Sequence, residues 1–224
     1  MGAGPERIEY SLADVPAGAT FRSVTAEPSD ATGRPALRIS LTEAVRYDGR
    51  PGVDFVDQPT FVILPLELEA GRLEVDISSD LLPDAPDYAR AFAGLAFAIA
   101  NDCSTFEAVY VRPYNGVPVA PDKPRRERAV QYFAFPTWPF DRLREERPHE
   151  GFESGADIRP GVWLHLVVEF DPTHVRAEVD GMEVVNRDRV GTGSGGAIGL
   201  FVDIGTDAHF ANLAVEMSSV RSAR

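Results

Sequence analysis

Two short apolar runs in the middle of the 224-residue chain carry polar and charged side chains that a buried strand does not need. They cover Phe106–Arg112 and Arg128–Phe135, with a loop rich in proline and arginine between them. Side chains of a strand point to opposite faces in turn, so Tyr110 and Arg112 share one face while Glu107 takes the other. We therefore predict that two adjacent strands floor a polar groove.

The chemistry of this predicted groove is that of a site for a polar ligand. Arginine offers a planar fork of donors, amides offer paired donors and acceptors, and an aromatic ring can stack on a sugar face. Gln131 is in phase with Phe133, whereas Tyr132 is in the opposite phase and faces the groove only if a bulge re-aims the strand. The predicted ligand-binding residues are Tyr110, Arg112, Asn115, Arg126, Gln131, Tyr132, Trp138 and Arg144.

Structural interpretations of the same residues stay open. Arg112 can pair with a loop acid and hold the turn that follows it, although alternation turns Glu107 away from it. Arg126 belongs to the densest basic cluster, residues 123–128, which either recognises a phosphate or uronate or is solvated and paired with nearby acids. Trp138 is either a stacking platform at the groove rim or a plug over one sheet edge.

An enzyme is the alternative to a binding domain. In that hypothesis Glu107 or Glu145 is the general acid or base, and Arg112 holds a glycoside or a small polar metabolite. A retaining glycosidase needs two carboxyl groups about 5 Å apart, and no such pair lies within one predicted strand. The chain also lacks a G-x-S-x-G turn and a Ser-His-Asp signature. A further alternative is a structural or interaction module that uses the outer face of the fold.

We expect no metal or cofactor. The four histidines lack the spacing of zinc ligands. Asp203 and Asp207 lie close together and leave Ca²⁺ as an alternative, although this ion takes about six to eight oxygens. The glycine-rich stretch at residues 191–196 precedes a predicted strand, not the helix whose N-terminus would bind a phosphate.

Composition limits the partners. The net charge of −13 argues against DNA and anionic membranes, because both repel a polyanion. The single Cys103 rules out an internal disulfide framework. The N-terminal residues lack the pattern of a signal peptide, and the longest apolar run, residues 91–100, is too short to span a bilayer. We predict a cytoplasmic protein that binds a sugar or glycosylated small molecule and neither nucleic acid nor membrane; the oligomeric state stays open.

Short runs of Val, Ile, Leu, Phe and Tyr recur between Gly, Pro and Asp, which predicts an all-β sandwich of two sheets with six or so strands each. Asp180-Gly181 predicts a tight type I′ hairpin, and Asp141–Arg147 predicts the one helical turn. No linker divides the chain, so we predict a single domain over 1–224, with N-terminal strands in 1–60 and a core in 61–216. The predicted strands are Ile8–Leu12, Thr20–Ala26, Ala36–Leu41, Phe61–Pro65, Gly71–Ser79, Ala91–Asn101, the two groove runs, Val162–Asp171, His174–Val179, Glu183–Asn186, Ala197–Ile204 and Ala208–Glu216.

Several runs together resemble the concanavalin A-like lectin/glucanase superfamily. They include FEAVYVRPYNG, RRERAVQYFAFPTWPFDRLREE, FESGADIRPGVWLHLVVEF and GAIGLFVDIGTDAHFANLAV. More narrowly, they look like a bacterial branch similar to 3-keto-disaccharide hydrolase and LamG-like domains. The resemblance covers roughly residues 61 to 215. It implies an antiparallel jelly-roll sandwich in which one bent sheet forms a concave groove for sugars or other polar ligands.

The resemblance does not extend to glucanase chemistry. Glucanase members use an E-x-D-x-x-E pattern on one strand, whereas Glu74 and Asp76 stand here without a third acid. The leading hypothesis is therefore a jelly-roll domain that binds a carbohydrate or glycoside in a polar concave groove.

Overall fold

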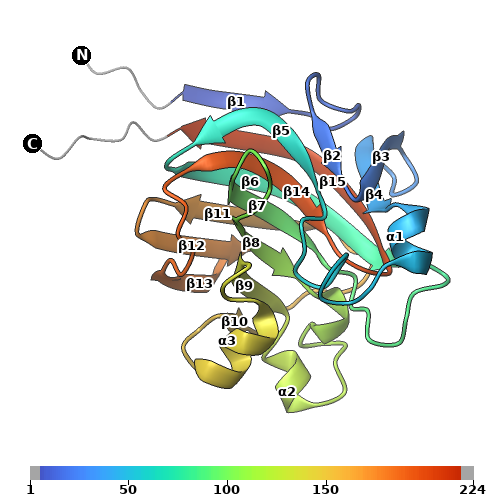
Figure 1. Ribbon diagram of the computed structural model, residues 1–224. Coiled ribbons are helices and arrows are strands. Elements are labelled where there is room, and N and C mark those ends of the chain that lie inside the picture. Colours follow the sequence, from blue (N-terminus) through green and yellow to red (C-terminus); the bar gives the residue numbers. More distant parts are fainter. Residues whose placement is uncertain (1–5, 218–224) are drawn as a thin grey trace, which may run out of the picture.

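Residues 6–217, which the computed structural model describes, fold into two antiparallel β-sheets packed face to face (Figure 1). Sheet A has eight strands in the order β13-β12-β11-β6-β15-β4-β3, with β1 paired to β15. Sheet B has seven strands in the order β10-β9-β8-β7-β14-β5-β2. The all-β, two-sheet jelly-roll prediction is confirmed, although the sheets are larger than the six strands expected.

The elements have the following bounds. Sheet A consists of β1 (Glu6–Tyr10), β3 (Val24–Ser29), β4 (Ala36–Leu41), β6 (Gly71–Leu81), β11 (Leu164–Phe170), β12 (His174–Val179), β13 (Met182–Asp188) and β15 (Thr206–Met217). Sheet B consists of β2 (Thr20–Arg22), β5 (Phe61–Leu68), β7 (Ala93–Ile99), β8 (Phe106–Val111), β9 (Val130–Phe135), β10 (Glu153–Ser154) and β14 (Gly196–Val202). The helices are α1 (Glu43–Asp48), α2 (Lys123–Arg126), α3 (Phe140–Glu146) and the 3₁₀ turn Pro113–Asn115.

The expected strand Thr20–Ala26 is two strands that belong to different sheets. Ser23 separates them with a φ of +61°, and the chain crosses there from β2 in sheet B to β3 in sheet A. The short helices α1 and α2 and the two-residue strand β10 were not predicted, because none is long enough to establish a period. A side-chain cap from Thr42 begins α1.

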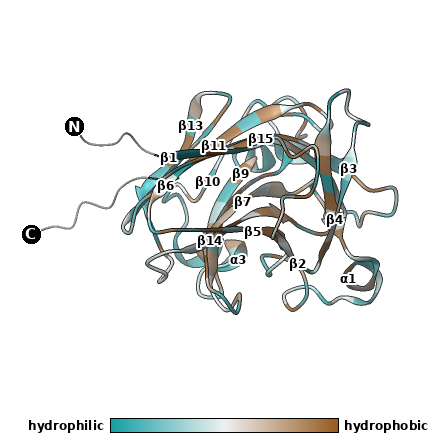
Figure 2. Cartoon of the chain, turned by 90° about the horizontal axis from the view of Figure 1, so that it is seen from above, coloured by the Kyte–Doolittle hydropathy of each residue, from teal (hydrophilic) through white to brown (hydrophobic). Residues whose placement is uncertain are grey.

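The core lies between the two sheets, whose strands carry many of the hydrophobic residues coloured brown in Figure 2. Sheet A contributes the predicted apolar face of β11, whose residues Leu166, Val168 and Phe170 are buried. Phe97 of β7 stacks on Phe170 with ring centroids 4.5 Å apart. Phe97 is the cross-strand partner of Glu107, so this face of β7 and β8 faces sheet A. The other face of sheet B points outward.

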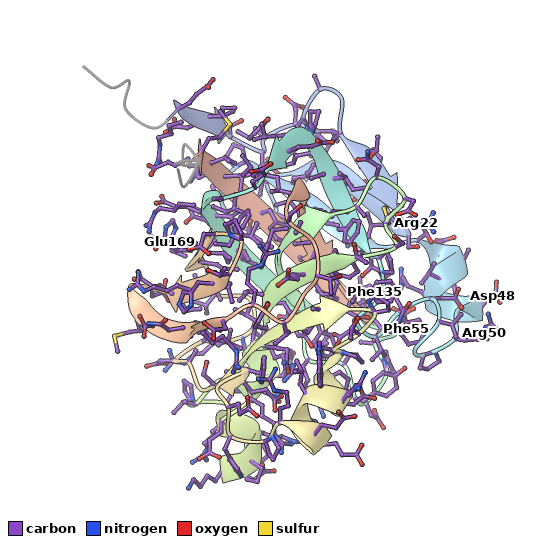
Figure 3. The ribbon with its side chains drawn as sticks, turned by 60° about the vertical axis from the view of Figure 1, so that its left-hand side comes forward. Arg22, Asp48, Arg50, Phe55, Phe135 and Glu169 are labelled. Atoms are coloured by element: carbon purple, nitrogen blue, oxygen red, sulfur yellow. The ribbon has the colours of Figure 1, made fainter. Side chains whose placement is uncertain are left out.

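The outer strands of the two sheets lie on opposite sides of the molecule. In Figure 3, Glu169 of sheet A lies on the side away from Phe135 of β9 in sheet B. The helices α2 and α3 gather at the end of sheet B where β9 and β10 pair (Figure 1). Within residues 6–217 the structure contains no helix with the length and apolar character needed to cross a membrane.

The predicted hairpin between β12 and β13 is confirmed. Asp180 and Gly181 both have positive φ angles, +49° and +78°, and Val179 pairs with Met182 across them. A two-residue turn with these angles matches the twist of the strands that it joins.

We expect Gly181→Ala to lower the free energy of unfolding by about 1 kcal/mol, because a Cβ at positive φ is strained even though no atom lies within 4 Å of it. Chemical denaturation measures this loss. Gly193→Ala is the matched control, since its Cβ would make only ordinary contacts and its φ is not positive. Equal stability of the two variants would contradict the strain assigned to the turn.

Candidate ligand-binding site

Aromatic rings fill most of the outer face of sheet B. Tyr110 and Gln131 are cross-strand partners and therefore share this face. Phe106 makes edge contacts with Phe61 and with Phe133, and each of these three rings is buried. A face so rich in phenylalanine is stable only when covered. The hollow expected along these strands is therefore occupied by the protein's own rings, and the residues of the predicted groove meet an opening at one end of the sheet.

The opening is a pocket of about 240 Å³ at the end of sheet B where β8 ends and β9 begins. Its walls come from segments far apart in the chain: the segment before β5, the loop between β6 and β7, the end of β8, the loop after β14, and the helices α2 and α3. The lining residues are Val56, Asp57, Tyr88, Arg90, Phe92, Tyr110, Arg112, Asn115, Arg125, Arg128, Phe140, Arg144, Asp203 and Ile204.

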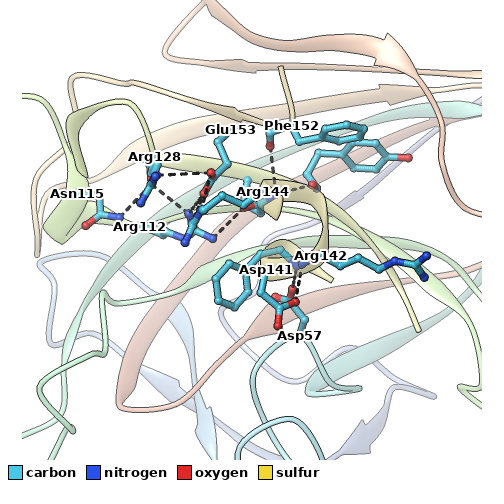
Figure 4. A network of polar contacts seen from close by, with 12 residues as sticks. Asp57, Arg112, Asn115, Arg128, Asp141, Arg142, Arg144, Phe152 and Glu153 are labelled. Atoms are coloured by element: carbon cyan, nitrogen blue, oxygen red, sulfur yellow. Dashed lines mark hydrogen bonds and ion pairs between the residues drawn. The ribbon is translucent and has the colours of Figure 1, made fainter. Parts of the chain in front are cut away.

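Arg112 is the centre of a buried hydrogen-bond network beneath this pocket (Figure 4). Its side chain is only 4% exposed. One terminal nitrogen donates to the Tyr110 hydroxyl at 2.8 Å and to Gln131 Oε1 at 3.0 Å. The other donates to Glu153 Oε1 at 2.7 Å. Arg112 therefore ties β8 to β9 and β10.

Glu153 is the shared counter-ion of the arginines at this end of the sheet. In Figure 4 three arginines surround its carboxylate, namely Arg112, Arg128 and Arg144. Burial raises the pKa of Glu153, but the hydrogen bond from Arg144 and the charge of Arg112 outweigh that effect, so the pKa lies below its ordinary value. The carboxylate thus stays ionised and orients the arginines along the pocket wall.

Two buried aspartates lie at the opposite wall. Asp203 accepts the backbone N–H groups of Val56, Asp57 and Ile204 at 3.0, 2.9 and 2.7 Å. Asp57, 1% exposed, accepts the backbone N–H of Phe140 at 2.6 Å. Burial raises the pKa of Asp57 to about 7 against these hydrogen bonds, and burial also raises the pKa of Asp203.

The open part of the pocket combines cations, rings and one unused acceptor. Tyr88 is half exposed at the rim, and Phe92 and Phe140 are partly buried beside it. Asn115 donates from Nδ2 to the backbone carbonyl of Arg128 at 3.0 Å. Its Oδ1 is buried and makes no hydrogen bond within residues 6–217. Such an unsatisfied acceptor is uncommon in a folded interior and marks this corner of the pocket.

Four of the predicted binding residues line this pocket: Tyr110, Arg112, Asn115 and Arg144. Gln131 shares their face, as the alternation predicted, but it is fully buried and lies outside the lining. Its Oε1 accepts from Arg112, and its Nε2 donates to the carbonyls of Tyr132 and Phe152. The structure therefore places Gln131 beneath the site as a support for Arg112.

The other predicted residues lie elsewhere. No bulge re-aims Tyr132, which points between the sheets and donates its hydroxyl hydrogen to Glu107. Trp138 is flanked by arginines, with the Arg142 guanidinium 4.4 Å from its ring centroid. Arg126 is exposed and donates to the carbonyl of Ala120 at 2.8 Å. None of the three lines the pocket.

The two glutamates considered as alternative catalytic groups both lie away from the pocket. Glu107 lies in the interior on the face toward sheet A, where Arg189 pairs with it at 2.5 Å. Both side chains of this pair are 2% exposed. Glu145 lies on the solvent side of α3. Neither glutamate lines the pocket.

The residues considered for Ca²⁺ have protein partners. Asp207 pairs with Arg38 at 2.7 Å, and the oxygens of Asp203 accept backbone N–H groups. In the part of the chain from 6 to 217, no three His, Cys, Asp or Glu side chains gather where they could hold an ion.

Sequence reasoning missed several pocket residues. Tyr88, Arg90 and Phe92 alternate in a loop, and this period of two is the signal that could have identified them. Asp57 and Glu153 have no local signal, because only the fold brings them to the end of sheet B.

Comparisons with known proteins agree with this architecture. No protein-family model and no curated protein matches the chain. A carbohydrate-binding module, CBM66 from Bacillus subtilis, has a TM-score of 0.52 at 16% identity over 88% of this chain and 97% of that one. A Bacillus subtilis protein of unknown function with a galectin-like fold has a TM-score of 0.58 at 12% identity, covering 98% of each chain. These similarities show a galectin-like jelly-roll fold.

We expect Asp57 to make the stability depend on pH. Its pKa rises on folding from 3.8 to about 7, so between these values the folded state binds more protons than the unfolded state. The free energy of unfolding therefore falls as pH rises from about 4 to 7, by at most about 1.4 kcal/mol per pH unit. Asp203, Arg112 and Tyr110 face the same carboxyl group and contribute to its pKa.

Denaturation of the wild type and of Asp57→Asn at pH 4, 5, 6, 7 and 8 measures this contribution. The stability difference between them should change steadily up to about pH 7 and level off above it. Asp87→Asn, on an exposed loop residue, is the control and should follow the wild type. Parallel curves for the wild type and Asp57→Asn would refute the assignment.

We expect Glu107→Gln to lower the free energy of unfolding by about 3–5 kcal/mol, because it leaves the Arg189 charge buried without a counter-ion. Adding Arg189→Met should recover part of this loss, since the second change removes the unpaired charge. Urea denaturation of the two single variants and the double variant measures the coupling. Additive losses would show that the pair does not act as a unit.

Proposed function

We propose that this protein binds a carbohydrate or glycoside in the pocket at the end of sheet B. The observation that carries the proposal is the meeting of an exposed ring, Tyr88, with an unused acceptor, Asn115 Oδ1, and arginine donors in one hollow. A sugar presents an apolar ring face and a rim of hydroxyl groups, and this lining complements both. The carbohydrate-binding module that shares the fold supports the same ligand class.

The proposal also covers the family to which the chain belongs and the number of its domains. We infer that it belongs to the bacterial branch similar to 3-keto-disaccharide hydrolase and LamG-like domains, on the sequence runs that resemble them. We also infer a single domain, because sheet A pairs the N-terminal strand β1 with the C-terminal strand β15.

An enzyme is the second candidate, and one observation favours it. Asp57 is a pocket carboxyl whose pKa of about 7 suits a general acid or base. Its position favours binding without catalysis, since Oδ2 accepts from the Phe140 backbone and Oδ1 from the Tyr110 hydroxyl at 3.2 Å. Retained sugar binding without turnover by the wild type would support the first candidate.

We expect Tyr88→Ala to weaken sugar binding by about tenfold, the worth of one stacked ring at a partly solvated site. Tyr47→Ala is the matched control, because Tyr47 is also an exposed tyrosine but lies on α1 outside the pocket lining. A glycan array identifies a ligand of the wild type, and calorimetry then measures both variants. Equal affinities for the two variants would contradict the assignment of the binding site to this pocket. If no glycan on the array binds, the proposed function is wrong.

A further inference from the structure

We propose that the ligand of this pocket is an acidic saccharide, whose carboxylate, sulfate or phosphate group is bound by Arg90, Arg125 and Arg128. This inference rests on the proposed function, since it names the class of sugar that the same pocket takes. It follows from the charge of the lining, from the donors that the fold leaves unused, and from the contrast with arginines elsewhere in the protein.

The charge of the pocket has the opposite sign to that of the protein. The chain carries −13, yet five of the fourteen lining residues are arginines. The carboxylates in contact with this set are Asp57, Asp203, Glu153 and Asp122, the last of which pairs with Arg125. Even with all four ionised, one positive charge is in excess. Such a local excess concentrates anions at the site.

The arginines of the pocket divide into two groups. The guanidinium of Arg112 donates to Tyr110, Gln131 and Glu153 and to the Arg128 carbonyl, and Arg144 donates twice to Glu153. These two cations are engaged by the fold.

The second group retains free donors. Within residues 6–217, Arg128 has one ionic contact, 3.6 Å to Glu153. Arg125 has one ionic contact, in which its Nε lies 3.8 Å from Asp122 Oδ2. The side chain of Arg90 donates only to the carbonyls of Asp87 and Ala89, from a single nitrogen.

Arg90 is repelled by two other arginines of the pocket, Arg125 and Arg112. Burial lowers the pKa of Arg90, and the charges of Arg125 and Arg112 lower it further. An anion between these side chains would remove the repulsion and take up their unused N–H groups, and the planar fork of arginine matches the oxygens of a carboxylate, sulfate or phosphate.

Arginines on the far side of the molecule have the opposite arrangement. Arg176, on the outer face of sheet A, has three acidic partners: Glu169, Glu178 and Glu183. A protein with 35 acidic and 22 basic residues can surround an arginine with carboxylates. At the pocket the arrangement is reversed, because three arginines surround the carboxylate of Glu153.

The pocket also provides for the rest of such a ligand. With an acid group held by the arginines, the sugar ring would lie beside Tyr88, and the lining also includes Asn115, whose Oδ1 has no partner within residues 6–217. The volume of about 240 Å³ suits one sugar residue more than a long chain.

The test compares neutral sugars with their acidic counterparts by calorimetry. The probes are galactose and glucose, galacturonate and glucuronate, and galactose 6-sulfate and glucose 6-phosphate, with sodium sulfate and sodium phosphate as anions without a sugar. We expect at least one acidic member to bind tenfold or more tightly than its neutral parent, with an affinity that falls as salt is raised from 25 to 250 mM. The uronates and the phosphate and sulfate esters distinguish the three kinds of acid group.

Variants locate the effect. Arg128→Gln and Arg90→Gln should each reduce the preference for the acidic sugar about tenfold. Arg22→Gln is the matched control: Arg22 is exposed on β2, the opposite edge strand of sheet B, well separated from α2 and α3 in Figure 3. It should leave the preference unchanged, and thermal melting verifies that each variant is folded.

The other outcomes are separable. Equal binding of neutral and acidic sugars overturns the acidic-ligand inference and leaves the sugar-binding function in place. Binding of sulfate or phosphate alone, as tight as that of the acidic sugars, overturns the sugar-binding function. Absence of binding by every probe and by the glycan array overturns both.

Discussion

The ion pair between Arg112 and Glu153 is the interaction on which the pocket end of the sandwich depends. Arg112 is a permanent cation that is almost completely buried, and an isolated charge there would cost several kcal/mol. Glu153 supplies the counter-charge, and the hydroxyl of Tyr110, the amide oxygen of Gln131 and the backbone carbonyl of Arg128 accept further hydrogen bonds. This requirement explains why a strand as short as β10 pairs with β9 at all: Glu153 is the cross-strand partner of Gln131.

Two aspartates join the opposite wall of the pocket in the same way. Asp203 follows β14 and accepts the backbone N–H groups of Val56 and Asp57, so it fixes the segment before β5. Asp57 in turn accepts the first N–H of α3, at Phe140. A chain of two carboxylates thus connects three segments that are distant in sequence. The walls of the pocket are therefore held in place by hydrogen bonds between the loops at the end of the sheet, in addition to the curvature of the sheet.

Periodicity in the sequence predicted the elements and faces of this structure but not what covers them. The bounds of Ala36–Leu41 and His174–Val179 match the predicted ones, because alternation and turn residues mark both strands. The common face of Tyr110 and Gln131 was likewise predicted from a period of two. Their burial was not, since it depends on long-range contacts with loops and α3 that have no period. For the same reason Glu153 and Asp57 could be assigned to the site only from the fold.

The pocket also shows why net charge is a weak guide to a ligand. At physiological ionic strength the field of an exposed charge is screened beyond about 8–10 Å. Most of the acidic side chains are spread over the surface, so a ligand within the hollow responds mainly to the charges that line it. There the arginines outnumber the carboxylates, and two of these carboxyl groups, Asp57 and Asp203, have pKa values raised by burial. An acidic protein can therefore present a cationic site without contradiction, provided that its acids lie outside the lining or have their oxygens turned to backbone N–H groups.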